Sequence, residues 1–195
     1  MRKLIVQQFT SIDGHAADPD GTTDFISEYA AKHDEGFERE AMEFMDTVDT
    51  MVLGRKTYEL FVRYWPSASG DDAEFGKKLN ALRKFVVSST LKEAPWGEWE
   101  GGTIIRDKPE EKIRALKQEN GKDIVIWGSI TLATAMMGAG LVDELQLRTI
   151  PVVLGGGRPL FDDDLDSRQL NLRRATPYEE GLVLLEYEAV AKPPS

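Results

Sequence analysis

The chain has 195 residues, of which 41% are hydrophobic and 30% are charged, a composition that supports one folded domain with a substantial core. Its 24 basic and 34 acidic residues give a formal net charge of −10. Because such a surface repels phosphate backbones and anionic lipids, the charge argues against general binding of nucleic acids or membranes. There are no cysteines, which excludes disulfides, thiolate nucleophiles and cysteine-based zinc sites.

The first residues, MRKLIVQQF, contain two cations, but their apolar run is short and is broken by two glutamines. This pattern is not that of a signal peptide. No apolar run approaches the roughly 20 residues that a membrane-spanning helix needs. Together with the absence of cysteine, these features predict a cytoplasmic protein.

Strands and helices alternate over the first 140 residues. Apolar runs predict strands at 3–9, 49–53, 84–88, 102–106 and 123–127, and helical periodicity predicts helices at 24–47, 56–62, 73–82, 109–119 and 129–137. The segment 11–24 is rich in Asp, Gly, Ser and Thr, so we expect a long loop of local turns.

After Asp143 the pattern changes to strands joined by turns, at 143–153, 169–175 and 181–190. Alternating strands and helices followed by consecutive strands are typical of an α/β fold whose mostly parallel sheet ends in antiparallel strands. We expect a single domain over residues 1–190 and a disordered tail at 191–195.

Three predicted strands end in small or hydroxyl residues where a helix or loop begins. These ends are VLGRKT (52–57), VVSST (86–90) and VIWGSIT (125–131). In open α/β sheets, ligands bind outside the carboxyl ends of the strands, where helix N-termini attract phosphate. An ordinary turn or helix cap explains any one of these ends alone, whereas three in one sheet favour a dinucleotide lying across them.

The usual dinucleotide and P-loop motifs, G-x-G-x-x-G and G-x-x-x-x-G-K-[ST], are absent. The residues resemble a different group, the dihydrofolate reductase-like superfamily. "MVLGRKTYE" looks like its strand–GR-x-T–helix motif, "FVVSST" like its second cofactor strand, and "IVIWGSITLATAMMGAGLVDELQLRTIPVVLGGGRPLF" like its third strand, helix and C-terminal strands. The early "SIDG" and the later "YWP" resemble specifically the reductase domain of bacterial riboflavin biosynthesis, the RibD C-terminal type, in a stand-alone form.

This resemblance implies a three-layer α/β/α fold of the dihydrofolate reductase type and NADPH as the cofactor. It assigns the cofactor's phosphates to Gly54, Arg55, Lys56 and Thr57, its adenosine 2′-phosphate to Ser88, Ser89 and Thr90, and its diphosphate to Gly128, Ser129, Ile130 and Thr131. The family's usual Gly-Gly pair is here Gly128-Ser129.

The resemblance also places the SIDG loop, with Asp13 and Gly14, over the nicotinamide beside Phe9, and Trp65 on the substrate side. Asp13 is the candidate catalytic group; the alternative is that it only makes an Asx turn before Gly14. Relatives in this family tend to be dimeric, and the late strands carry many apolar residues, so we expect a homodimer.

Other polar groups have simpler interpretations. Asp34 and Glu35 occupy the region of the pterin-binding carboxylate of dihydrofolate reductases, but an exposed acidic helix face is the favoured interpretation. DPDGTTD (18–24) fails the EF-hand pattern, and the two histidines do not make a metal site. We interpret the aspartates 162–164 as a solvated turn and the glycines 155–157 as a turn in which a ligand role stays open.

The sequence therefore predicts an NADPH-dependent reductase acting on a small heterocyclic or ribosylamino-pyrimidine substrate. The alternatives are dihydrofolate reductase itself and a non-catalytic nucleotide-binding module. A zinc deaminase partner domain is excluded within this chain because its ligands include cysteines.

Overall fold

The computed structural model describes residues 1–161 and 165–190. The acidic run at 162–164, expected to be a solvated turn, and the tail at 191–195, expected to be disordered, lie outside the described residues.

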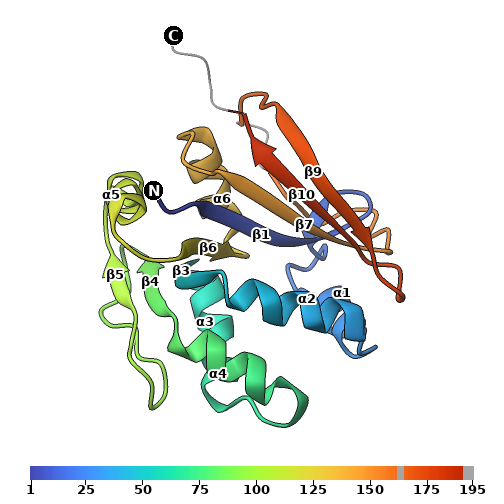
Figure 1. Ribbon diagram of the computed structural model, residues 1–195, viewed down its shortest axis with the longest axis horizontal. Helices are drawn as coiled ribbons and strands as arrows, with labels where there is room; N and C mark the ends of the chain where they lie inside the picture. Colours follow the sequence, from blue (N-terminus) through green and yellow to red (C-terminus); the bar gives the residue numbers. More distant parts are fainter. Residues whose placement is uncertain (162–164, 191–195) are drawn as a thin grey trace.

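An eight-stranded sheet forms the centre of the molecule (Figure 1). Its strands, in spatial order, are β5 (Thr103–Ile105), β4 (Arg83–Val87), β3 (Val48–Gly54), β6 (Asp123–Trp127), β1 (Leu4–Ser11), β7 (Glu144–Ile150), β10 (Val183–Ala189) and β9 (Leu170–Pro177). The strands from β5 to β7 pair in parallel, and β10 and β9 pair antiparallel. The predicted α/β class, with antiparallel C-terminal strands at one edge, is confirmed.

Helices cover both faces of this sheet, as Figure 1 shows. On one face, α2 (Glu35–Met45), α3 (Arg55–Tyr64) and α4 (Ala73–Ala81) bury Phe44, Tyr58 and Leu79 against the strands. On the other face lie α5 (Pro109–Gln118) and α6 (Ile130–Gly138) with a second apolar core. The three layers are therefore α/β/α. No helix in the described part of the chain is long and apolar enough to cross a membrane.

The helix expected at 24–47 is instead two helices, α1 (Asp24–Ala30) and α2. The interruption is at His33, whose φ of 52° is left-handed and stops the helical hydrogen bonding. Asp34 then caps α2, because its carboxylate accepts the N–H of Phe37 at 3.1 Å. Each helix has apolar residues spaced four apart, Phe25 and Tyr29 in α1 and Phe37 and Ala41 in α2, and this spacing does not by itself reveal the break between them.

The expected loop at 11–24 contains a short strand, β2 (His15–Ala17), which pairs antiparallel with β8 (Arg158–Pro159). This small second sheet joins the segment after β1 to the glycine-rich segment after β7. The early loop is thus partly ordered by residues that are more than 140 positions away in the sequence.

Parallel pairing brings the carboxyl ends of β4, β3, β6, β1 and β7 together at one end of the sheet. The strands β4, β3 and β6, which carry the three predicted ligand-binding ends, are direct neighbours in the sheet. Open α/β sheets bind ligands at this end, outside the carboxyl ends of the strands.

Candidate functional site

The turn after β3 and the turn after β6 are bonded to each other. The Ser129 hydroxyl accepts the backbone N–H of Gly54 at 2.8 Å, and the Ser129 N–H donates to Oγ1 of Thr57 at 3.0 Å. Two segments 75 residues apart in the chain therefore form one surface. Ser129 adopts a left-handed φ of 55°, which costs a non-glycine residue on the order of 1–2 kcal/mol. Its hydroxyl bonds offset that cost, and this explains how a serine is accommodated after Gly128.

Gly128 is required for this close approach. Its φ is 53°, and a Cβ there would lie 3.1 Å from Oγ1 of Thr57. A side chain at this position would push the two turns apart. The backbone carbonyl of Gly128 also accepts a hydrogen bond from the side-chain amide of Gln8 on β1, a contact that no sequence pattern indicated.

Both turns lead directly into helix N-termini, at Arg55 for α3 and at Ile130 for α6. Helix N-termini present N–H groups without intrahelical partners and the positive end of the helix dipole. Arg55 and Lys56 are exposed in the first turn of α3, and Arg55 lies 3.6 Å from Glu59. The two turns contain amides, hydroxyls and cations but no carboxylate, so this donor set fits a phosphate-bearing cofactor such as NADPH.

The remaining strand end, that of β4, lies next to the end of β3. The register pairs Gly54 with Val87 at the ends of β3 and β4, so Ser88 follows β4 where Arg55 begins α3 after β3. Ser88 is buried, and its hydroxyl accepts the N–H groups of Thr90 at 3.3 Å and Leu91 at 3.1 Å. Ser88 therefore shapes the turn, whereas Ser89 and Thr90 are exposed and available to a ligand.

Asp13 connects the SIDG segment to the glycine-rich segment. Its carboxylate accepts the backbone N–H groups of Leu154 at 3.1 Å and Gly155 at 2.8 Å. A hydrogen bond from the Ser11 side chain, and then those two amides, lower the pKa of Asp13 well below its ordinary value. Asp13 is thus an ionised acceptor at neutral pH and not a proton donor. Nδ1 of His15 lies 3.4 Å from the same carboxylate.

Phe9 is half-buried and packs edge-on against Phe37 of α2, with ring centroids 6.0 Å apart. Above the Phe9 ring lies the guanidinium of Arg148, which is buried and bonds Glu40 at 3.1 Å. Burial raises the pKa of Glu40 and lowers that of Arg148. Sequence reasoning missed this ion pair, because its only signal is a charged residue at an inward position of β7.

Trp65 lies at the end of α3 and packs against Phe61 and Phe75, with centroids 6.2 Å and 5.2 Å away. Phe61 also packs on Trp127 of β6. In the described part of the chain, no ring contact or hydrogen bond joins Trp65 to Phe9 or Asp13. The structure therefore places Trp65 in the packing between α3 and α4, and its ring contact with Phe61 leads on to Trp127 of β6.

The interpretation of Asp34 as part of an exposed acidic face is wrong, although Glu35 is exposed. Asp34 is buried and accepts the N–H groups of Phe37 at 3.1 Å and Glu180 at 3.0 Å. Burial alone raises the pKa of Asp34, but these backbone hydrogen bonds outweigh burial and lower it overall. Asp34 thus joins α2 to the turn before β10.

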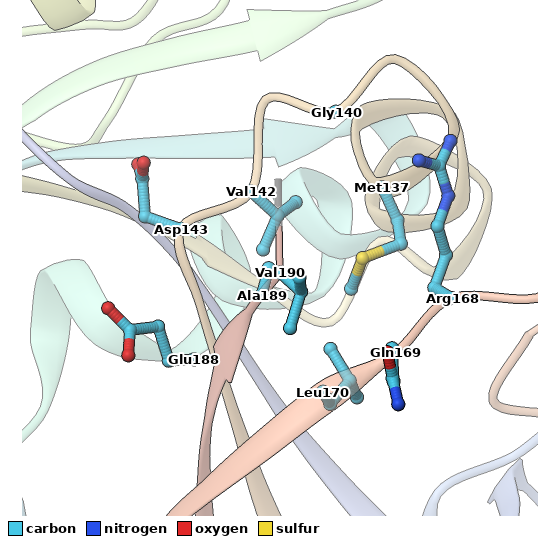
Figure 2. A pocket seen from close by; sticks show the side chains of 10 residues that line it. All are labelled: Met137, Gly140, Val142, Asp143, Arg168, Gln169, Leu170, Glu188, Ala189 and Val190. Atoms are coloured by element: carbon cyan, nitrogen blue, oxygen red, sulfur yellow. The ribbon is translucent and has the colours of Figure 1, made fainter. Parts of the chain in front are cut away.

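A pocket of about 150 Å³ lies at the opposite end of the sheet from these strand ends, beside the amino end of β7 (Figure 2). The carboxylates of Asp143 and Glu188 lie on one side of it and the Arg168 guanidinium on the other. None of the predicted cofactor residues lines this pocket. Among the described residues, no group of three or more His, Asp or Glu side chains is arranged to hold a metal ion.

Comparison with known proteins identifies the family to which this chain belongs. The chain belongs to the RibD C-terminal domain family, whose model matches residues 2–184. It is 31% identical over 188 residues to the uncharacterised protein YyaP of Bacillus subtilis, covering 95% of this chain and 94% of YyaP.

Solved structures share the fold. A putative riboflavin biosynthesis protein from Shewanella sp. PV-4 has a TM-score of 0.75 and 24% identity, with 96% of this chain and 99% of that chain covered. A dihydrofolate reductase from Enterococcus faecalis, complexed with NADP(H), has a TM-score of 0.59 and 17% identity, with 98% and 97% covered. The expected resemblance to the riboflavin reductase type and the dihydrofolate reductase-like fold are thereby confirmed.

Proposed function

We propose that this chain is an NADPH-dependent reductase resembling the 5-amino-6-(5-phosphoribosylamino)uracil reductase of riboflavin biosynthesis. It transfers hydride to a small heterocyclic or ribosylamino-pyrimidine substrate. The observation that carries this proposal is the bonded pair of turns, in which Ser129 contacts Gly54 and Thr57 between two helix N-termini. Family membership supports the same activity.

In this proposal NADPH supplies the hydride, and the protein supplies binding and orientation. Arg55, Lys56 and Thr57 hold phosphate at the start of α3, Ser89 and Thr90 face the adenosine 2′-phosphate, and the turn from Gly128 to Thr131 holds the diphosphate. Phe9, near the end of β1, and Gly14, in the turn that follows this strand, face the nicotinamide. Because Phe61 connects Trp65 to Trp127, Trp65 supports the substrate side through that aromatic row.

Asp13 acts in this scheme as a positioning residue, since its ionised carboxylate holds Leu154 and Gly155. Asp13→Ala should therefore lower kcat more than it weakens NADPH binding, because the phosphates are held at other strand ends. Asp20→Ala removes a carboxylate of the same segment that bonds Thr22 instead, so it is the matched control and should change neither quantity. Full activity of Asp13→Ala would leave Asp13 only its turn-forming role.

The decisive experiment has two stages. Calorimetric titration first measures NADPH binding. The loss of reduced-nicotinamide absorbance then follows turnover with the phosphoribosylamino-pyrimidine and, separately, with dihydrofolate. Steady oxidation with the pyrimidine supports the proposal, and oxidation only with dihydrofolate favours the dihydrofolate reductase alternative.

Binding without turnover of any candidate substrate would favour the non-catalytic module, and absence of binding would refute the cofactor assignment. The structure offers one argument against a pterin substrate. The carboxylate of Asp34, in the region where dihydrofolate reductases bind the pterin, is buried and already accepts two backbone N–H groups.

A further inference from the structure

A buried cation lies against the aromatic ring of Phe9. Phe9 and Arg148 are register partners on the neighbouring strands β1 and β7, near the carboxyl ends of both, so their side chains project from the same face of the sheet. The guanidinium carbon of Arg148 lies 5.5 Å from the centre of the Phe9 ring. Arg148 is only 5% exposed, whereas Phe9 is half-buried. The charge is therefore enclosed, while the ring beside it keeps an accessible side.

Helix α2 supplies the partner of this cation. Phe37 and Glu40 are three residues apart on α2, a spacing that places both on one face of a helix. Oε2 of Glu40 accepts a hydrogen bond of 3.1 Å from Nη2 of Arg148, and the guanidinium also lies 4.8 Å from the centre of the Phe37 ring. The side chains of Arg148 and Glu40 are 6% and 13% exposed, so salt and water screen this ion pair little.

The other charges near Glu40 compensate each other. Arg174 of β9 and Glu186 of β10 also act electrostatically on Glu40, but they form an ion pair of their own. Among the described residues, Glu40 is the carboxylate within ion-pair distance of Arg148. Removal of the Glu40 charge alone thus leaves one uncompensated, buried positive charge next to Phe9.

The charge of a nicotinamide ring depends on its redox state. The ring of NADPH is uncharged, and loss of a hydride, which is one proton with two electrons, leaves the positively charged ring of NADP+. An unpaired cation nearby repels the oxidised ring more than the reduced ring. It also opposes the charge that develops on the ring during hydride donation. A carboxylate that cancels the cation removes both effects.

We infer that Glu40 and Arg148 form a charge-compensated pair that sets the relative affinity of the site for the oxidised and the reduced nicotinamide. Both are positioning residues, which act through their charges and through Phe9 rather than by touching the ring. This inference rests on the proposed function, which places the nicotinamide beside Phe9. It adds to that function two residues, on α2 and β7, that lie outside the three strand ends.

The Kd of NADP+ divided by the Kd of NADPH measures this effect without any substrate. Glu40→Gln keeps an oxygen that can accept the Arg148 N–H but removes the negative charge. The ratio should rise about threefold to tenfold, because one unpaired unit charge then acts over a short distance at an effective dielectric constant of about 20. Arg148→Gln leaves the carboxylate unpaired instead and should lower the ratio. Calorimetric titration of each variant with both cofactors gives the two constants.

The double variant Glu40→Gln/Arg148→Gln separates charge from packing. It changes both side chains but carries neither charge, so its ratio should be close to that of the wild type. Asp143→Asn is the matched control, since it leaves the buried Lys117 without its carboxylate at the opposite end of the sheet and should not change the ratio. Urea denaturation establishes that each variant is folded. If Glu40→Gln does not fold, Arg148→Gln and the double variant carry the test.

The inference is overturned if the two single variants shift the ratio in the same direction or leave it unchanged. It is also overturned if the double variant departs from the wild-type ratio as far as a single variant does, because packing would then explain the effect. These results leave the proposed function intact when the wild-type chain binds NADPH. A wild-type chain that binds neither NADPH nor NADP+ refutes the proposed function and the inference together.

Discussion

Arg55 is the residue on which the preference for NADPH over NADH is expected to depend. It begins α3 directly after Gly54, which pairs with Val87 at the end of β4, and the exposed Ser89 and Thr90 follow that strand. Arg55→Ala should weaken NADPH binding more than NADH binding by about 1.5–3 kcal/mol, because one charged hydrogen bond to the 2′-phosphate is lost. Calorimetry with both cofactors measures the difference. Arg63→Ala at the other end of the same helix is the control, and equal weakening of both cofactors by Arg55→Ala contradicts the assignment.

Asp34 provides a test of stability at the same scale. Its carboxylate caps α2 and binds the N–H of Glu180, so Asp34→Ala should lower the free energy of unfolding by about 0.5–2 kcal/mol at neutral pH. The pKa of Asp34 is lowered in the folded state. Its contribution is therefore present above the unfolded pKa of about 4 and is lost as the pH falls below it.

Urea denaturation of both proteins from neutral pH to pH 3 measures this change. The difference between them should shrink on acidification. Glu35→Ala, one residue along on the same helix and exposed, should show little difference at any pH. A pH-independent effect of Asp34→Ala would mean that packing, rather than the charge, stabilises this junction.

Individual roles were the least predictable part of the site. Glycine and hydroxyl residues at strand ends indicate a ligand edge because their chemistry is local. The bonds of Asp13 to Leu154 and Gly155 are not local, and no spacing in the sequence encodes them. For the same reason the sequence did not reveal Arg158 beside Thr131 or Arg148 beside Glu40.

At the scale of the element, the small sheet of β2 and β8 is the least expected feature. Its strands have three and two residues, too few to show an alternating pattern, and its segments read as turns. Gly157→Ala should disrupt this sheet. Gly157 has a φ of 121°, and a Cβ at this position would lie 2.1 Å from the carbonyl oxygen of Ala17. We expect a loss of about 1–3 kcal/mol in the free energy of unfolding.

Gly155→Ala is the matched control for that substitution. Its φ is also positive, at 71°, but a Cβ there meets nothing within 4 Å, so Gly155→Ala should cost less. Thermal unfolding of the two variants, with hydrogen exchange at His15 to Ala17, makes the comparison. Equal destabilisation would show that backbone strain alone, and not the contact with β2, decides the cost.

The sequence predicted best the helices and strands whose pattern of apolar residues lies within the element itself. Runs such as DIVIW and KFVVS are buried along most of their length, and they correspond to β6 and to most of β4. The split between α1 and α2 depends instead on the capping contact of Asp34 and on its bond to Glu180, 146 residues away. Periodicity records the apolar face of each helix but not the distant contact of Asp34 that separates the two helices.

At the scale of the whole molecule, the fold class was predictable because alternating strands and helices leave few topologies. The order of strands was not, since nothing local places β6 between β3 and β1. The expectation that the three strand ends lie in one sheet came from their shared residue chemistry, and the structure places β4, β3 and β6 next to one another.

The outer strand β9 leads to the last prediction, a two-fold homodimer. β9 pairs only with β10, so its other edge is unpaired within the described chain, and its eight residues are mostly exposed. The opposite edge strand, β5, has only three residues. Leu172 on β9 is 56% exposed. A long edge with an exposed apolar side chain favours association with a second copy, and antiparallel pairing of β9 with its own copy satisfies two-fold symmetry.

Light scattering at micromolar concentration should therefore give twice the 21.8 kDa mass of one chain. Leu172→Lys should shift the protein toward that single-chain mass, because it places a charge in the apolar contact. Leu60→Lys is the matched control, since Leu60 on α3 is also 56% exposed but lies away from this edge. A wild-type mass near 21.8 kDa would contradict the dimer. A dimer that Leu172→Lys leaves intact would place the interface elsewhere than β9.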